Sequence, residues 1–229
     1  VLPLMTRFLT AVSAAALFTC AGAGVASAQN FSQLAQQDLT AAHAALRDNH
    51  PAAVVQGPAS ERFRAWLDAG LADAQSKAGR VNSGDSHAYL MRYYGAGFRD
   101  SNISIRPTYE GLGPYFGTSW PGFTTGWRGG KYVVTYIQEG VRGTPPVGAT
   151  LVDCGGTTAE DLARTKLDLW EGNLDTEAGR VTSAPYLLWN RNNPFTSGVP
   201  GVCNFQVGNS RRPREFQLRP VPVTPAALE

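Results

Sequence analysis

The sequence predicts an α+β protein in which a helical N-terminal part precedes a β-rich part. Apolar residues recur at helical spacing between Leu34 and Tyr94, which is typical of short amphipathic helices. Beyond Ile103 the chain becomes rich in glycine, aromatic and β-branched residues, and residues 132–137 (Tyr-Val-Val-Thr-Tyr-Ile) form its clearest strand. We therefore expect three helices first, and then a sheet with one or two helices of its own.

The first 28 residues have the pattern of a secretory signal peptide. Residues 5–7 (Met-Thr-Arg) form a short basic start, and Met5 is taken as the true first residue. Residues 8–25 carry no charge, and residues 26–28 (Ala-Ser-Ala) are the small-residue pattern that a signal peptidase cleaves. We predict an exported protein, periplasmic or extracellular, whose mature chain begins at Gln29 and has no stable membrane span.

Two other readings of this leader remain open. A transmembrane anchor is disfavoured because the apolar run is short, rich in alanine and glycine, and followed by a cleavage site. A lipid anchor on Cys20 is disfavoured because Thr19 is an unusual residue directly before the modified cysteine.

Three helices are predicted in the N-terminal part, because apolar residues fall on one face in three successive stretches. The first helix ends at His50, since the residue before Pro51 avoids the α region. The second begins near Ser60, a suitable N-cap, and the third begins near Asp85. Glycines shortly after Tyr94 end the third helix.

The β-rich part is predicted to contain short strands, two hairpins and two helical stretches. Gly129-Gly130 turns the first hairpin, and a polar turn before residue 215 turns the second. Thr158 and Asp161 resemble a capping box at the start of a helix that runs to about Trp170. Another helical stretch is expected at residues 177–189. Strands are predicted at residues 103–105, 132–137, 150–154, 203–207 and 215–221.

Charge and cysteine content exclude some functions. The net charge of +2 does not predict nucleic-acid binding, and the cluster Arg211, Arg212 and Arg214 is interpreted as a solvated hairpin tip. Export leaves Cys154 and Cys203, which often pair in an oxidising compartment; the alternative is two separate buried thiols. Pairing would close a long loop and contribute roughly 4 kcal/mol in the chain-entropy model. No histidine lies near either cysteine in the sequence, so zinc is not expected.

The strongest nucleophile candidate is Ser86, because residues 84–88 (Gly-Asp-Ser-His-Ala) nearly match the G-x-S-x-G elbow. That chemistry needs a strand before the serine and a histidine brought in from later in the chain. All three histidines lie at or before residue 87, and a loop precedes the motif. We therefore interpret Asp85 or Ser86 as a helix N-cap.

Metal and lysine chemistry are not predicted either. His43 and His50 are two helical turns apart, with no evident third ligand. The only lysines, Lys77, Lys131 and Lys166, are interpreted as solvated charges. No cofactor, metal site or catalytic residue is therefore expected in this chain.

Two binding features remain. The backbone N–H groups of Gly111, Leu112 and Gly113 would form a nest that holds the terminal carboxylate of a peptide, while the extended peptide adds to a sheet edge; the alternative is a plain turn. Aromatic residues of the β-rich part are interpreted as core rather than as a sugar-binding surface. The aromatic residues in question are Tyr115, Phe116, Trp120, Trp127, Trp170 and Trp189.

The order of these elements resembles a known module. Residues 132–137, the loop 143–148 (Gly-Thr-Pro-Pro-Val-Gly) and residues 150–156 (Thr-Leu-Val-Asp-Cys-Gly-Gly), followed by a helix and a hairpin, are similar to a PDZ-like module of secreted processing proteases. Residues 38–51 resemble the leading helix of those proteases, which ends in His-Pro, and residues 98–105 resemble their Asp-Gly-His-Thr segment. The chain thus resembles the N-terminal half of the S41 serine peptidases, which include tail-specific and C-terminal-processing proteases.

After the predicted signal peptide (1–28), the resemblance implies a helical domain (29–107), a PDZ-like domain (108–222) and a linker-like tail (223–229). It also implies a function: the chain is the substrate-recognition part of an exported serine endopeptidase that acts on peptides or unfolded proteins without a cofactor. The catalytic domain of the family, which follows the PDZ-like module, is expected to be absent from this chain.

One residue departs from the family pattern. Asp100 matches, but Asn102 stands where many relatives carry histidine, and asparagine cannot accept a proton there. The alternative is therefore a catalytically inactive, periplasmic peptide- or protein-binding module. A small-molecule or glycan binder would instead need an aromatic-lined pocket.

Overall fold

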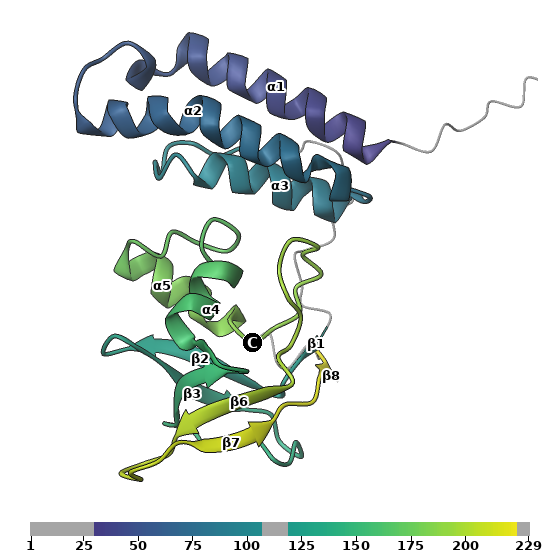
Figure 1. Cartoon of the computed structure of the whole chain (residues 1–229), viewed down its shortest axis with the longest axis vertical. Helices are drawn as coiled ribbons and strands as arrows, with labels where there is room; N and C mark the ends of the chain where they lie inside the picture. The colour runs from purple at the N-terminus through teal and green to yellow at the C-terminus, as the bar shows by residue number, and fades with distance from the viewer. Residues whose placement is uncertain (1–29, 107–118, 224–229) are drawn as a thin grey trace, which may run out of the picture.

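The computed structural model describes residues 30–106 and 119–223 and confirms the α+β class. Three helices form one layer, and a β-rich module with helices of its own lies beside it (Figure 1). The helices of the layer are α1 (Phe31–Asn49), α2 (Pro58–Lys77) and α3 (Gly84–Ala96), joined through the short 3₁₀ helices η1 (Pro51–Ala53) and η2 (Ala78–Arg80).

The ends of these helices follow local rules, with two corrections to the prediction. As expected, α1 stops at His50, whose backbone is extended before Pro51. However, α2 begins at Pro58 rather than near Ser60, because proline suits the first turn of a helix, where its missing N–H costs nothing. The N-cap of α3 is Ser83, not Asp85 or Ser86.

A single apolar core joins the three helices, and Trp66 shows how tightly they pack. Its indole Nε1 donates a hydrogen bond to the carbonyl oxygen of Tyr94, 2.8 Å away. A Cβ atom at either Gly70 or Gly97 would collide with the indole ring, so both positions need glycine. The most buried large residues of this core are Leu39, Phe63, Leu67, Leu90, Met91, Tyr94 and Phe98.

The module is built on an antiparallel sheet with the strand order β2-β3-β4-β6-β7. The β2–β3 hairpin turns at Gly129 and Gly130, which both have positive φ, as predicted. A short β5 pairs with β4, and β1 pairs with β8. The bounds are β1 (Ser119–Trp120), β2 (Phe123–Arg128), β3 (Lys131–Ile137), β4 (Thr150–Cys154), β5 (Thr157–Thr158), β6 (Val202–Gln206), β7 (Arg214–Gln217) and β8 (Val221–Pro222).

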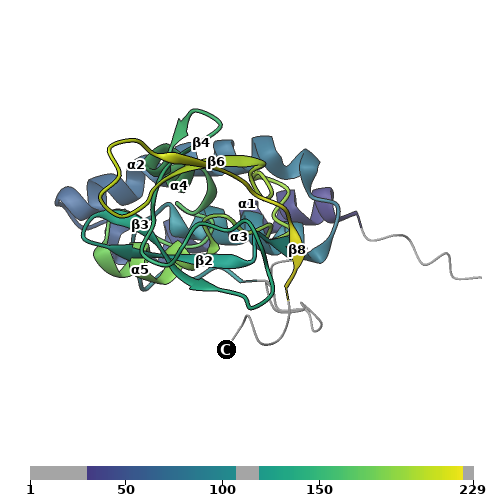
Figure 2. The ribbon, with the colours of Figure 1, turned by 90° about the horizontal axis from the view of Figure 1, so that it is seen from below.

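The helices α4 (Ala159–Lys166) and α5 (Glu177–Ser183) and the 3₁₀ helix η3 (Ala184–Tyr186) lie between the sheet and the helical layer (Figure 1). From below, the sheet lies in front of the helices (Figure 2). The predicted cap of α4 is present, since Thr158 Oγ1 accepts a hydrogen bond from the N–H of Asp161 at 3.1 Å. The buried module core includes Phe123, Tyr132, Leu151, Leu167, Leu187 and Phe205.

Three predicted elements of this region differ from the structure. Residues 103–105 form no strand, because Ile103 and Ile105 pack onto the helical core instead of pairing with a sheet. Helix α4 ends at Lys166, four residues before Trp170, and Leu169 has a positive φ that no helix allows. The helical stretch after Glu177 breaks into α5 and η3, where Pro185 supplies no N–H.

The layer and the module are held together by a charged contact around Arg99. Its guanidinium donates to both carboxylate oxygens of Asp168 at 2.7 Å and to Asn173 at 2.6 Å. Burial raises the pKa of Asp168, but Arg99, the N–H of Leu174 and Arg164 together outweigh burial and lower the pKa of that carboxyl. Beside this pair, the ring of Trp170 stacks on Tyr93, with 4.3 Å between the ring centroids.

A disulfide joins Cys154 of β4 to Cys203 of β6, which are directly opposite each other in the sheet. It closes a loop between residues 49 apart in the sequence. Across residues 30–106 and 119–223, no helix combines the length and the apolar character needed to cross a membrane.

Candidate functional site

Gly111, Leu112 and Gly113, the predicted peptide-binding nest, lie outside the described residues, so that assignment stays a prediction. The same holds for the predicted signal peptide and the tail after residue 223. The candidate site must therefore be built from the remaining residues.

Ser86 is held in a structural role. Its hydroxyl oxygen accepts hydrogen bonds from the N–H groups of Asn82 and Ser83, both at 3.0 Å, and donates to the carbonyl oxygen of Ser83 at 2.9 Å. Together Ser83 and Ser86 form the capping box of α3. A hydroxyl committed in this way, and 1% exposed, is not an available nucleophile.

Each histidine lies beside a different aspartate of the helical layer. His43 Nε2 is 2.8 Å from an oxygen of Asp68, and His50 Nε2 is 3.8 Å from an oxygen of Asp100. His87 is fully buried, and its Nε2 is 3.1 Å from an oxygen of Asp38. Burial lowers the pKa of His87 although Asp38 acts in the opposite direction. The described residues contain no group of three or more side chains that would hold a metal ion.

Lys166 is buried, so its interpretation as a solvated charge is wrong. Its side chain is buried within the module, and its Nζ donates to the carbonyl oxygens of Trp189 at 3.0 Å and Gly198 at 2.8 Å. Burial lowers the pKa of Lys166 to about 8, although Glu171 opposes the shift. The role supported by these contacts is to fix the segment that follows η3.

The segment predicted to resemble the family's Asp-Gly-His-Thr motif forms a turn after α3. Asp100 Oδ1 accepts hydrogen bonds from the backbone N–H of Asn102 at 2.8 Å and from its side-chain amide at 3.0 Å. Asn102 therefore stabilises this turn through Asp100, a local Asx-type arrangement that needs no titratable group.

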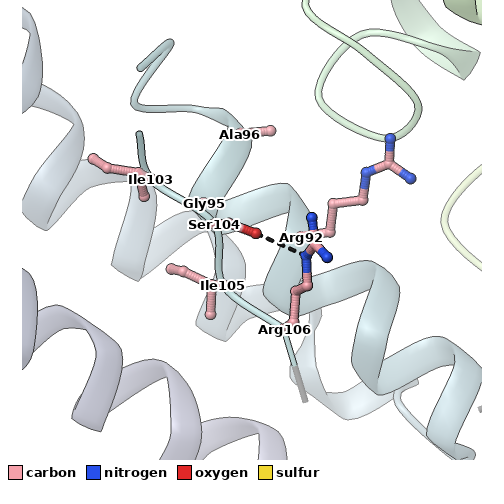
Figure 3. Close-up of a pocket in the computed structure, with 7 residues that line it drawn as sticks. All are labelled: Arg92, Gly95, Ala96, Ile103, Ser104, Ile105 and Arg106. Atoms are coloured by element: carbon pink, nitrogen blue, oxygen red, sulfur yellow. Dashed lines mark hydrogen bonds between the residues drawn. The ribbon is translucent and has the colours of Figure 1, made fainter. Parts of the chain in front are cut away.

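A pocket of about 400 Å³ lies between the end of α3 and residues 103–106 (Figure 3). Arg106 folds back and donates to Ser104 Oγ at 2.8 Å, whereas Arg92 extends toward the module and donates to the carbonyl oxygen of Glu171 at 2.6 Å. The pocket therefore adjoins the contact between layer and module, and Arg92 is engaged in that contact.

A larger groove of about 820 Å³ borders the outer strand β7. Every residue from Arg214 to Arg219 lines it, so the groove runs along the strand rather than over one of its faces. The opposite wall is the loop of residues 140–144, in which Gly140 and Gly143 both have positive φ. Pro121 and Val221 complete the lining.

The outer strand β2, at the other end of the sheet, is covered by helices. Thr125 Oγ1 donates to the carbonyl oxygen of Ala184 in η3 at 2.6 Å, and Thr125 is buried. The indole N–H of Trp127 donates to Glu177 of α5 at 2.9 Å, and the guanidinium of Arg180 lies 4.6 Å from the Trp127 ring centroid. A pocket of about 530 Å³ meets β2 only at Trp127, whereas the groove of about 820 Å³ runs along the whole of β7.

The tryptophans belong mostly to the core, as predicted. Of the aromatic residues singled out in the β-rich part, Trp120, Trp170 and Trp189 are buried and Trp127 is partly exposed, beneath Arg180, whereas Tyr115 and Phe116 lie outside the described residues. The buried rings offer no stacking surface for a sugar. The groove beside β7 is consequently the candidate functional site.

No family model and no curated protein matches the sequence. Solved structures of CPAF, a chlamydial serine protease, match the fold. Mature CPAF has 17% sequence identity and a TM-score of 0.52, and the match covers 84% of this chain and 35% of the CPAF chain. Mature CPAF complexed with lactacystin gives a TM-score of 0.51 at 17% identity and covers 84% of this chain and 36% of that one.

The chain shares its fold with part of CPAF. A CPAF variant in which a serine is replaced by alanine matches equally, with a TM-score of 0.51, 17% identity, and coverage of 84% and 35%. The chain thus spans about a third of the length of CPAF. At this identity the likeness to CPAF shows the fold, and the CPAF-like region includes both the helical layer and the module.

Proposed function

We propose that this chain is the substrate-recognition part of an exported serine-type peptidase of the S41 kind, and that it binds extended peptides or unfolded proteins through a PDZ-like module. The observation that carries the proposal is the open groove along β7 on a protease-related fold. A sheet with an accessible outer strand suits an extended polypeptide, because strand addition supplies backbone hydrogen bonds for any sequence.

The role of recognition rather than chemistry is supported by what the candidate residues do. The hydroxyl of Ser86 caps a helix, and the ammonium of Lys166 binds two carbonyl oxygens. Neither is placed to attack a peptide bond. In the proposal, the nucleophile and its base belong to a separate catalytic domain.

Export is supported by the disulfide between Cys154 and Cys203, because such bonds persist in oxidising compartments. The test is N-terminal sequencing of the protein recovered outside the cytoplasm. The proposal expects Gln29 as the first residue, and an uncleaved leader would contradict it.

The functional test compares residues 29–229 with the full natural gene product. Binding to an unfolded protein, such as labelled reduced casein, is measured by fluorescence anisotropy, and hydrolysis by release of labelled peptides. We expect both proteins to bind casein and only a product that includes a catalytic domain to cleave it. Cleavage by residues 29–229 alone would overturn the assignment of recognition without chemistry, and absence of binding would overturn recognition itself.

An inactive binding module is the second candidate function, and the position of Asn102 favours it. Asn102 stabilises the turn after α3 through Asp100 and has no basic nitrogen to accept a proton. Binding of casein by the full natural product with no cleavage would select this function.

A further inference from the structure

The groove beside β7 combines an accessible strand with a surplus of positive charge. In the described part of the chain, β7 pairs with β6 on one side and with no strand on the other. Short outer strands with charged side chains are also a means of preventing aggregation, so accessibility alone does not identify a binding site. The direction of the β7 backbone groups, the charge of the groove and the shape of the groove together indicate a binding site.

The backbone direction follows from one hydrogen bond. The N–H of Leu218 donates to the carbonyl oxygen of Gly201 at 2.8 Å, on the β6 side of the strand. The N–H and C=O groups of an antiparallel strand alternate between its two edges. The backbone groups of Phe216 therefore also point toward β6, whereas those of Glu215 and Gln217 point outward. Two residues therefore present their backbone donors and acceptors to the groove.

The charge of the groove is set by Arg142, Arg214 and Arg219, against the single carboxylate of Glu215. The side-chain oxygen of Glu215 accepts a hydrogen bond from the Gln217 amide at 3.2 Å. Within residues 30–106 and 119–223, none of the three arginines forms an ion pair. Their guanidinium groups, on both walls of the groove, remain available to carboxylates of a ligand.

The shape of the groove fits an extended segment rather than a helix or a small molecule. It follows consecutive residues of a strand, and its two walls are β7 and the loop 140–144. Phe216 is half-buried beneath the Arg214 guanidinium, which lies 5.5 Å from the ring centroid, and so supplies an apolar contact next to a positive one. Because Arg214 and Phe216 are two residues apart in β7, they lie on one face, and the side chains of an added strand on that face would meet both surfaces.

We propose that the groove along β7 binds an extended, acidic segment of an unfolded protein as an added strand of the sheet. This inference rests on the proposed function and specifies both the edge that is used and the charge of the preferred substrate. Backbone groups of Glu215 and Gln217 pair with the segment, and Arg142, Arg214 and Arg219 select glutamate or aspartate side chains.

The decisive variant is Gln217→Pro, with Gln217→Ala as the matched control. Proline removes the outward N–H without touching a β6–β7 hydrogen bond, and it is tolerated at outer strands. The probe is a short fluorescein-labelled peptide that alternates glutamate and valine, titrated with the full chain and followed by anisotropy. One lost backbone hydrogen bond corresponds to about tenfold weaker binding for Gln217→Pro, whereas Gln217→Ala should bind like the parent chain.

Charge selection is tested in parallel with a peptide that alternates lysine and valine, and with Arg142→Glu on the far wall. We expect the lysine peptide to bind at least about tenfold more weakly, and Arg142→Glu to weaken the acidic peptide by about threefold and to reduce its salt dependence. Arg142 lies on an exposed loop, so this variant keeps the test valid even if Gln217→Pro impairs folding, which circular dichroism would reveal.

The outcomes separate the two proposals. If folded Gln217→Pro and Arg142→Glu both bind the acidic peptide as the parent chain does, the β7 groove is not the site. Equal binding of the lysine peptide overturns the acidic preference. If casein binds the parent chain and every variant equally, recognition stands and this inference fails; if neither peptide nor casein binds the parent chain, the proposed function itself fails.

Discussion

The two outer strands of the same sheet have different surroundings. Strand β2 has α5 and η3 packed against it, and its side chains form specific contacts with both, including the Thr125 hydrogen bond to Ala184. Strand β7 pairs with β6 and otherwise borders a groove. Both strands have an unpaired edge in the described part of the sheet, but helices cover one face of β2, whereas a groove runs along β7.

The comparison also shows how the covered end is maintained. Lys166 of α4 reaches through the module and binds the carbonyl oxygens of Trp189 and Gly198, which lie after η3. The disulfide Cys154–Cys203 holds β4 to β6 in the middle of the sheet, between the two ends. Three perturbations are given below in order of decreasing expected effect. They change the disulfide in the middle of the sheet, Lys166 near the covered end, and the contact between β2 and η3.

Removing the disulfide should have the largest effect. For a loop between residues 49 apart, the chain-entropy model predicts that Cys154→Ala with Cys203→Ala lowers the free energy of unfolding by about 4 kcal/mol. Urea denaturation followed by tryptophan fluorescence measures the change. The parent chain in reducing agent is the control and should match the double variant, and a loss below about 1 kcal/mol would show that the unfolded chain was already constrained.

Titration of Lys166 should have the next largest effect. The folded state lowers its pKa to about 8 from 10.5, so between these pH values the unfolded state binds more protons and stability rises with pH. The full shift corresponds to about 3 kcal/mol. Urea denaturation across this pH range measures the rise, and Lys166→Met should lose the contribution of Lys166 to it. An unchanged slope in Lys166→Met would assign the rise to another group.

Thr125→Val should have the smallest effect. Valine keeps the shape of threonine but removes the hydrogen bond from Thr125 to the carbonyl oxygen of Ala184, which then accepts only from the N–H of Leu187, so the change should cost about 1 kcal/mol. Hydrogen exchange should speed up in β2 and η3 and stay unchanged in β7. Equal acceleration at both ends would mean that the two outer strands open together and that the comparison between them fails. Thr157→Val, at an exposed position of β5, is the control.

Local signals in the sequence predicted much of the fold. The Gly129-Gly130 turn, the Thr158 cap of α4 and the stop of α1 before Pro51 depend on neighbouring residues, and each is present. The pairing of Cys154 with Cys203 also agrees with the structure, because the two cysteines that follow the predicted signal peptide leave one intramolecular combination.

Other features depend on contacts between distant residues and were missed. Lys166 looks solvated in the sequence because its partners, the carbonyl oxygens of Trp189 and Gly198, are backbone groups without a side-chain signature. Ile103 and Ile105 alternate like a strand, but α3 and not a sheet receives them. The groove lies between residues 140–144 and residues 214–219, and no local sequence pattern predicts that these two segments lie close together. The predicted domain boundaries stay predictions.

The packing of Trp66 has a consequence for how this sequence can change by descent. The indole fills the space in which Gly70 and Gly97 would carry a Cβ atom, so alanine at either glycine is excluded while the tryptophan is present. Replacing the tryptophan first removes that restriction and leaves a cavity that larger residues at 70 and 97 can refill. The order of mutation therefore matters: Trp66 has to be replaced before residue 70 or residue 97 can acquire a side chain.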